Sequence, residues 1–174
     1  MWEAGIRATG GGIKGTKSDF AVVNFKWDKG KWKYSSRNAN HRLWVPDGKG
    51  GREYLTQLQY HELRQTLGVW QAVDRNEVRQ TEVMTKKALQ WSRNARTGFL
   101  LRNDIVFGVK TSLYLSITFG LMATALDQNQ CSEVFKPIQK HALSPMGYNT
   151  NMPKIVVHGL TQYRGMGLWD IYTV

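Results

Sequence analysis

The chain has 174 residues and a single cysteine, Cys131, so an internal disulfide framework and a zinc cluster built from cysteines are both excluded. Hydrophobic residues make up 41% of the sequence, which is enough for a folded core. The formal net charge of +11 favours a polyanionic partner, because lysine and arginine release counterions when they contact phosphates. Residues 1–52 hold 11 basic and 4 acidic residues, so the positive charge is concentrated on the amino-terminal side.

The segment from Phe20 to Tyr34 predicts a β-hairpin. Alternating residues lead up to Trp27, Asp28-Lys29-Gly30 breaks the pattern, and Lys31-Trp32-Lys33-Tyr34 resumes it. In one interpretation the aromatic residues of the hairpin are cross-strand core partners and its lysines are merely solvated. In the other, the hairpin is a basic ribbon that lies against a nucleic-acid backbone. The alternation permits both.

The rest of residues 1–72 also indicates β-structure. Further short strands are predicted at Tyr54–Leu58 and at Leu67–Trp70. The glycines from Gly10 to Gly15 indicate a turn before the first strand. They lack the spacing of a phosphate-binding loop.

From residue 76 the period changes to that of a helix. Met84, Ala88, Trp91 and Ala95 form an apolar stripe, and Thr97-Gly98 supplies a stop signal. Asp74 is placed to cap this helix, with Glu77 completing a capping box.

Two more helices are predicted after Gly98. The apolar stretch from Ile105 to Leu126 predicts a buried helix, in which Gly120 lets a neighbour approach closely; a membrane span is the alternative, because about 20 predominantly apolar residues suffice to cross a bilayer. The third helix begins between Asp127 and Gln130, and Pro137 kinks or splits it. We therefore expect an α+β fold, with a small antiparallel β region in residues 1–72 and a helical region in residues 73–174.

The sequence predicts no catalytic centre. Its four histidines lack metal-binding spacing, and Cys131 has no nucleophile signature, so it is interpreted as a small structural residue. Catalysis of phosphoryl transfer by two metal ions requires converging carboxylates, and no two aspartates are adjacent. We expect no catalytic residue, no metal ligand and no cofactor within this chain.

Several short motifs resemble the carboxyl-side region of retrotransposon reverse transcriptases. The segments concerned are Gly11-Gly12-Ile13-Lys14-Gly15-Thr16-Lys17-Ser18-Asp19-Phe20, Asn24-Phe25-Lys26-Trp27, Gly30-Lys31-Trp32-Lys33-Tyr34, Thr66-Leu67-Gly68-Val69, Lys86-Lys87-Ala88-Leu89-Gln90-Trp91, Gln130-Cys131, Pro137-Ile138-Gln139-Lys140, Val157-His158-Gly159 and Gly165-Met166-Gly167-Leu168. The resemblance implies the end of a polymerase palm followed by a thumb, which grip a template and primer. It also implies that the catalytic aspartates lie upstream, with magnesium needed only by a full-length polymerase. Lys17, or equally Lys14, would match the lysine near the incoming nucleotide.

Under this hypothesis the chain is a fragment of an RNA-directed DNA polymerase that contacts RNA or DNA template-primer and is inactive alone. The missing palm and fingers region is then a second partner. The expected nucleic-acid contacts are Lys17, Lys26, Lys29, Lys31, Lys33, Arg37, Lys86 and Arg93. The alternative is an independent basic module whose Trp27, Trp32 and Tyr34 stack unpaired bases. The amino terminus lacks an apolar leader, so we expect an intracellular protein rather than a secreted one, and a membrane is not the expected partner.

Overall fold

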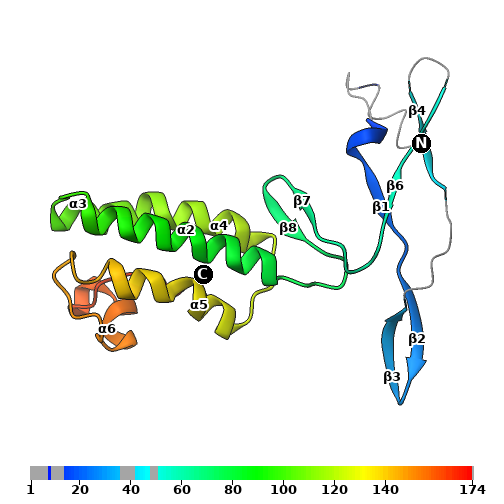
Figure 1. The fold of residues 1–174 in the computed structure, drawn as a ribbon. Coiled ribbons are helices and arrows are strands. Elements are labelled where there is room, and N and C mark those ends of the chain that lie inside the picture. The colour runs from blue at the N-terminus through cyan, green and yellow to red at the C-terminus, as the bar shows by residue number, and fades with distance from the viewer. Residues whose placement is uncertain (1–7, 9–13, 36–41, 48–50, 174) are drawn as a thin grey trace. The chain divides into compact units, whose positions relative to one another are not determined.

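The computed structural model describes residue 8 and residues 14–35, 42–47 and 51–173 (Figure 1). Contacts divide the chain into two units. The β unit comprises residues 1–63 and 72–74, and the helical unit comprises residues 64–71 and 75–174. A hairpin at residues 64–71 therefore groups with the helices, whereas the sequence analysis drew the division at residue 72.

The β unit consists of short strand pairs. The strand β1 (Asp19–Ala21) runs parallel to β6 (Thr56–Leu58), a long-range pairing that sequence reasoning missed. The strands β2 (Asn24–Asp28) and β3 (Lys31–Ser35) form the predicted antiparallel hairpin, and β4 (Trp44–Pro46) pairs antiparallel with β5 (Arg52–Tyr54). Within the described residues of this unit, no apolar side chain is fully buried. Its strands are therefore held mainly by backbone pairing and by contacts at the surface.

The helical unit opens with the antiparallel pair β7 (Arg64–Thr66) and β8 (Val69–Gln71). The helices that follow are α2 (Val78–Thr97), α3 (Arg102–Gly108), α4 (Tyr114–Met122), α5 (Gln128–His141) and α6 (Lys154–His158). A π-helical turn, Val109–Leu113, joins α3 to α4 without a break. As Figure 1 shows, α3 and α4 run back along α2, and α2 also packs against α5. Small strand pairs with helices confirm the predicted α+β class.

The core of the protein lies between these helices. Met84, Ala88 and Ala95 of the predicted α2 stripe are buried, whereas Trp91 is only partly buried against the core. The predicted close approach at Gly120 is confirmed, since α2 lies directly against it. A Cβ at this position of α4 would lie 2.6 Å from Gln80 Nε2 and 3.0 Å from Met84 Sδ. Gln80 is itself buried and accepts a hydrogen bond of 3.0 Å from the Trp70 backbone N–H, so it ties the β7–β8 pair to this packing.

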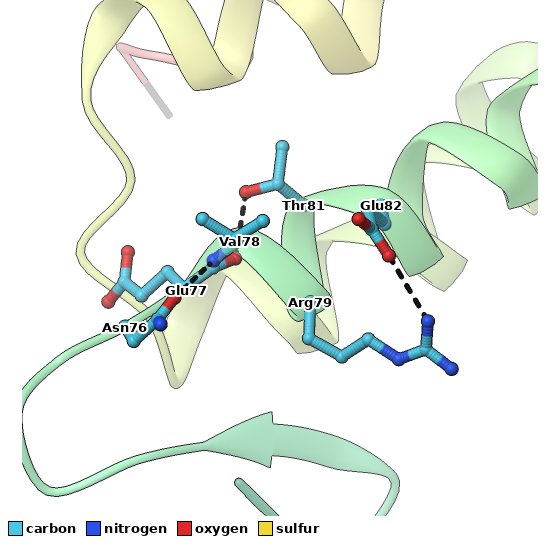
Figure 2. Close-up of polar contacts among 6 residues, drawn as sticks. All are labelled: Asn76, Glu77, Val78, Arg79, Thr81 and Glu82. Carbon is cyan, nitrogen blue, oxygen red and sulfur yellow. Dashed lines mark hydrogen bonds and ion pairs between the residues drawn. The ribbon is translucent and has the colours of Figure 1, made fainter. Parts of the chain in front are cut away.

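The predicted capping box at the start of α2 is wrong. Glu77, not Asp74, occupies the cap position, and its side chain makes no capping hydrogen bond. Figure 2 shows the actual arrangement: the Val78 N–H donates to Asn76 Oδ1 at 3.2 Å, and Thr81 Oγ1 donates to the Glu77 carbonyl at 3.0 Å. The Glu77 carboxylate instead accepts from the Ala125 N–H at 2.7 Å, so a tertiary contact replaces the local one.

The third helix begins with a capping box that the sequence analysis did not identify. Asp127 Oδ1 accepts from the Gln130 N–H at 2.8 Å, and Gln130 Oε1 accepts from the Asp127 N–H at 2.9 Å. Pro137 is buried within α5, which continues to His141, so the proline does not split the helix.

The apolar helix has two different sides. Ile105, Val109, Leu113 and Ile117 on its inner side belong to the core, as predicted for a buried helix. Its outer side is exposed at Phe107, Leu115, Phe119 and Met122. The stretch Arg102–Met122 has 21 residues and a mean hydropathy of 1.5, so by length and composition alone it is able to cross a membrane.

Candidate nucleic-acid interface

The β2–β3 hairpin separates aromatic residues from lysines by its register. Phe25 pairs with Tyr34 and Trp27 pairs with Trp32, so these four rings share one face. Lys26 pairs with Lys33, and Asp28 pairs with Lys31, on the opposite face. The two sets are therefore an aromatic face and a lysine face of the same ribbon.

The turn of the hairpin is tight. Lys29 and Gly30 connect the paired residues Asp28 and Lys31, and both have left-handed backbone conformations, with φ of 48° and 80°. This is the geometry of a two-residue type I′ turn, whose twist matches that of the flanking strands. The sequence places the break at the three residues Asp28-Lys29-Gly30, but Asp28 is still paired, so the turn is one residue shorter and has Lys29 at its tip.

The aromatic face is open to solvent. Trp27 is 60% exposed, Trp32 is 67% exposed and Phe25 is 54% exposed. Trp27 and Trp32 are indeed cross-strand partners, with ring centroids 5.1 Å apart in an edge-to-face arrangement, and Phe25 lies 5.0 Å from Tyr34. The interpretation of these tryptophans as core residues is therefore wrong, since nothing in the described structure covers them. Phe25 belongs to this face too, and the same alternation already indicated it.

Tyr34 anchors the hairpin to its own unit. Its ring stacks on the ring of Tyr60 at 5.3 Å with an interplanar angle of 9°, and Tyr60 in turn meets His61 at 5.1 Å. Tyr34 and Tyr60 are half-buried. Tyr34 is thus partly engaged in structure, and the free stacking surface belongs to Phe25, Trp27 and Trp32.

The lysines of the hairpin are all exposed. Lys33 Nζ lies 2.7 Å from Asp28 Oδ2, and this pair offsets part of the repulsion between the directly opposed Lys26 and Lys33. Residues 24–35 contain four lysines and one aspartate, so the hairpin has a net positive charge. The directly opposed Lys26 and Lys33 oppose the stability of an isolated hairpin, whereas the cross-strand pair of Trp27 and Trp32 supports it. Such local conflicts are expected where a surface binds a ligand.

The glycine-rich segment before β1 binds a side-chain carboxylate of the same chain. In the 3-10 turn Gly15–Lys17 the N–H groups of Gly15 and Thr16 donate to the two carboxylate oxygens of Glu53, at 2.8 and 3.0 Å. Gly15 is buried there, and a Cβ would collide with the Glu53 side chain. The backbone donors that a phosphate would need are therefore occupied by this chain's own carboxylate. Lys17 ends the same turn and is exposed.

The basic residues of α2 differ from one another in their neighbours, unlike the exposed lysines of the hairpin. Arg79 is paired with Glu82 at 3.1 Å (Figure 2), and its guanidinium also lies 5.6 Å from the Trp70 ring. Lys86 lines a hollow of about 440 Å³ between α2 and α5 together with Glu82 and Glu133. Lys86 therefore belongs to a surface of mixed charge rather than to a basic stripe. Arg93 is exposed near the end of the helix.

Cys131 and His141 of the helical unit both have shifted pKa values. Burial raises the pKa of the Cys131 thiol, and Asp170 raises it further, so this buried cysteine is a poor nucleophile. Loss of solvent lowers the pKa of His141, and the neighbouring charges of Lys140, Arg93 and Arg96 lower it further. Within the part of the chain that the structure describes, no three His, Cys, Asp or Glu side chains gather in a way that suits a metal ion.

The structure brings four of the predicted contact residues together, namely Lys26, Lys29, Lys31 and Lys33. Lys17 lies on a separate turn of the same unit, Lys86 and Arg93 lie on α2 of the helical unit, and Arg37 lies outside the described residues. The hairpin is therefore the candidate interface. Comparisons with protein-family models, with curated proteins and with solved structures found no match to this chain.

Proposed function

We propose that this chain binds single-stranded nucleic acid through the β2–β3 hairpin, with Trp27 and Trp32 stacking on bases and the hairpin lysines contacting phosphates. The observation that carries the proposal is the exposure of both tryptophans, 60% and 67%, on a hairpin that bears four lysines. Base faces are accessible to stacking only where they are unpaired, which favours single strands over duplexes. The net charge of +11 adds a long-range attraction to any such strand.

The aromatic face and the lysine face of the hairpin make different contacts with the nucleic acid. Stacking on an aromatic ring contributes about 1 to 3 kcal/mol per base and tolerates any sequence. Lysine contacts to phosphates are also independent of sequence, and they weaken as salt increases. Lysine side chains are long enough to reach around the edge of a two-stranded ribbon toward a strand on its aromatic face. Binding is therefore expected to show little sequence preference and a strong salt dependence.

The decisive experiment replaces both exposed tryptophans. Trp27→Ala with Trp32→Ala removes the stacking surface while leaving every lysine in place. We expect affinity for a fluorescent single-stranded oligonucleotide to fall about 10- to 100-fold, as the loss of one or two stacked bases implies. Fluorescence anisotropy measures the affinity, and circular dichroism checks the fold.

The matched control is Tyr163→Ala, which removes an aromatic ring that is 78% exposed on the helical unit. Its affinity should equal that of the parent chain. A folded double variant that binds as tightly as the parent would refute the proposal. Unfolding of the double variant would instead show that the tryptophans support the β unit.

The relationship to reverse transcriptases rests on the sequence motifs and stays a prediction. We propose it as the wider context of the same activity, in which the hairpin grips a template or primer beside a separate catalytic region. The purified chain is then expected to bind primed templates without extending them. Nucleotide incorporation by this chain alone in a primer-extension assay would contradict that expectation.

A further inference from the structure

The turn between α2 and α3 exposes three consecutive apolar side chains. Phe99 is fully exposed, Leu100 is 50% exposed and Leu101 is 73% exposed. Phe99 has a left-handed backbone conformation, with φ of 51°, which is costly for a residue with a bulky side chain. We call these three residues the apolar corner. It lies at the end of the α2 and α3–α4 pair, within the helical unit (Figure 1).

Arginines flank the apolar corner on both sides in the chain. Arg93 and Arg96 lie on the last turns of α2. Arg102 is the first residue of α3 and is exposed, and its guanidinium lies 4.7 Å from the centre of the Tyr148 ring. The positive charge of Lys140, near the end of α5, lowers the pKa of His141, and so do the charges of Arg93 and Arg96. The ends of α2 and α5 therefore carry positive charge close to the same histidine. Across residues 93–104 the only acidic residue is Asp104.

The apolar surface continues along the outer side of the next helix. Phe107 is 68% exposed and Leu115 is 62% exposed on that side. Lys110 is the only charged residue between Asp104 and Asp127, so the outer side lacks the charges that a solvated helix face normally carries. Apolar side chains bordered by arginines match the two properties of an anionic lipid surface, its negative headgroups and the hydrocarbon beneath them.

We propose that the apolar corner inserts into an anionic lipid bilayer, with Arg93, Arg96 and Arg102 contacting the headgroups. This is a second binding activity, separate from the hairpin. The corner inserts at the surface only, because the inner side of α3 and α4 is already occupied by the protein core. The lipid chemistry required is a negatively charged headgroup of any kind.

Other occupants fit the corner less well. A second copy of a chain with a net charge of +11 would bring its own arginines against these. Nucleic acid would contact the arginines, but Leu100 and Leu101 have no ring on which a base stacks.

The test measures binding of the whole chain to vesicles of phosphatidylcholine with about 30% phosphatidylserine, and to pure phosphatidylcholine vesicles. We expect binding to the anionic vesicles alone. Replacing Phe99, Leu100 and Leu101 together by Ser should reduce the partition coefficient about tenfold or more, since the apolar contribution is lost. Replacing Arg93, Arg96 and Arg102 together by Gln should also reduce it about tenfold.

The matched control is Leu67→Ser. Leu67 is 86% exposed and, like Phe99, occupies a turn with a left-handed conformation, φ 50°, but it lies on the β7–β8 hairpin. Its loss should leave vesicle binding unchanged. The variant without Trp27 and Trp32 should also keep full vesicle binding, which separates this proposal from the proposed function.

A second measurement reports insertion directly. Cys131, the single native cysteine, is buried, so an environment-sensitive dye will label Leu100→Cys selectively. We expect a blue shift of the dye on anionic vesicles, and no shift for the same dye at Leu67→Cys. The proposal is overturned if vesicles are not bound, or if the dye at position 100 stays in water. The proposal is also overturned if the triple Ser variant keeps its vesicle binding. The same holds if this variant keeps vesicle binding but loses oligonucleotide binding or self-association.

Discussion

At the scale of single residues, the carboxyl-terminal segment depends on two glycines that touch. The Met166 N–H donates to the Val156 carbonyl at 2.9 Å and the Gly167 N–H donates to the Gly159 carbonyl at 2.8 Å, so this segment folds back beside α6. A Cβ on Gly165 would overlap the carbonyl group of Gly159. Since the obstruction is backbone, no side-chain rotation relieves it.

Gly165→Ala is therefore expected to destabilise the protein by about 3 kcal/mol, through overpacking against backbone. Urea unfolding monitored by circular dichroism measures the change in free energy of unfolding. Gln162→Ala, an exposed position in the same segment, serves as the control and should change it by less than about 0.5 kcal/mol. An unchanged midpoint for Gly165→Ala would show that the two glycines do not approach each other as described.

At the scale of elements, the hairpin turn contains a residue poorly suited to its conformation. Lys29 adopts a left-handed conformation that costs most residues about 1 kcal/mol or more, whereas asparagine adopts it more readily and is common in type I′ turns before glycine. Lysine at this position contributes charge at the tip of the proposed interface. Lys29 thus lowers the stability of the turn but places a positive charge where the proposed binding would use it.

Lys29→Asn is expected to stabilise the β2–β3 hairpin by about 0.5 kcal/mol. Amide hydrogen exchange of the strand residues measures the gain. Lys31→Asn removes the same charge from a strand position and should not stabilise the hairpin, because asparagine disfavours strands. Each variant should also reduce the slope of log affinity against log salt by about 0.7, the value for one lost phosphate contact on a single strand. Slower exchange in the Lys31 variant than in the Lys29 variant would contradict this account.

At the scale of the whole molecule, the buried apolar residues are distributed unequally. Among the described residues, every fully buried apolar side chain belongs to the helical unit. Hydrophobic burial is the dominant favourable contribution to folding, so the helical unit should hold most of the stability. The β unit, with its half-buried strands, is the part that a bound nucleic acid would stabilise most.

A fragment comprising residues 64–174 should therefore fold alone and unfold cooperatively, while losing affinity for single-stranded oligonucleotides. Circular dichroism and thermal unfolding check the first statement, and fluorescence anisotropy checks the second. Ile117→Ala within the fragment is the sensitivity control, and loss of this buried side chain should cost about 2 to 5 kcal/mol. A fragment that lacks helical structure would show that the β unit is needed for folding.

The helices and the main hairpin were predictable because their signals are local. The stripe through Met84, Ala88 and Ala95 and the stop at Gly98 anticipated α2, and the alternation through Trp27 and Trp32 anticipated β2 and β3. The pairing of β1 with β6 was missed because a parallel pair joins segments far apart in the chain and leaves no local pattern. The predicted capping box is wrong because α2 begins at Val78, three residues later than a cap at Asp74 requires, and because Glu77 contacts Ala125, a residue that only the folded chain brings near.

The sequence by itself determined the α+β class, the basic hairpin and which residues share each of its faces, since backbone periodicity and charge are properties of neighbouring residues. Only the tertiary structure decided which apolar residues are covered. It left Trp27, Trp32 and the Phe99–Leu101 turn exposed and placed Gly120 against Gln80. The physical reason is that periodicity assigns a side chain to a face, whereas burial depends on whether another element packs against that face.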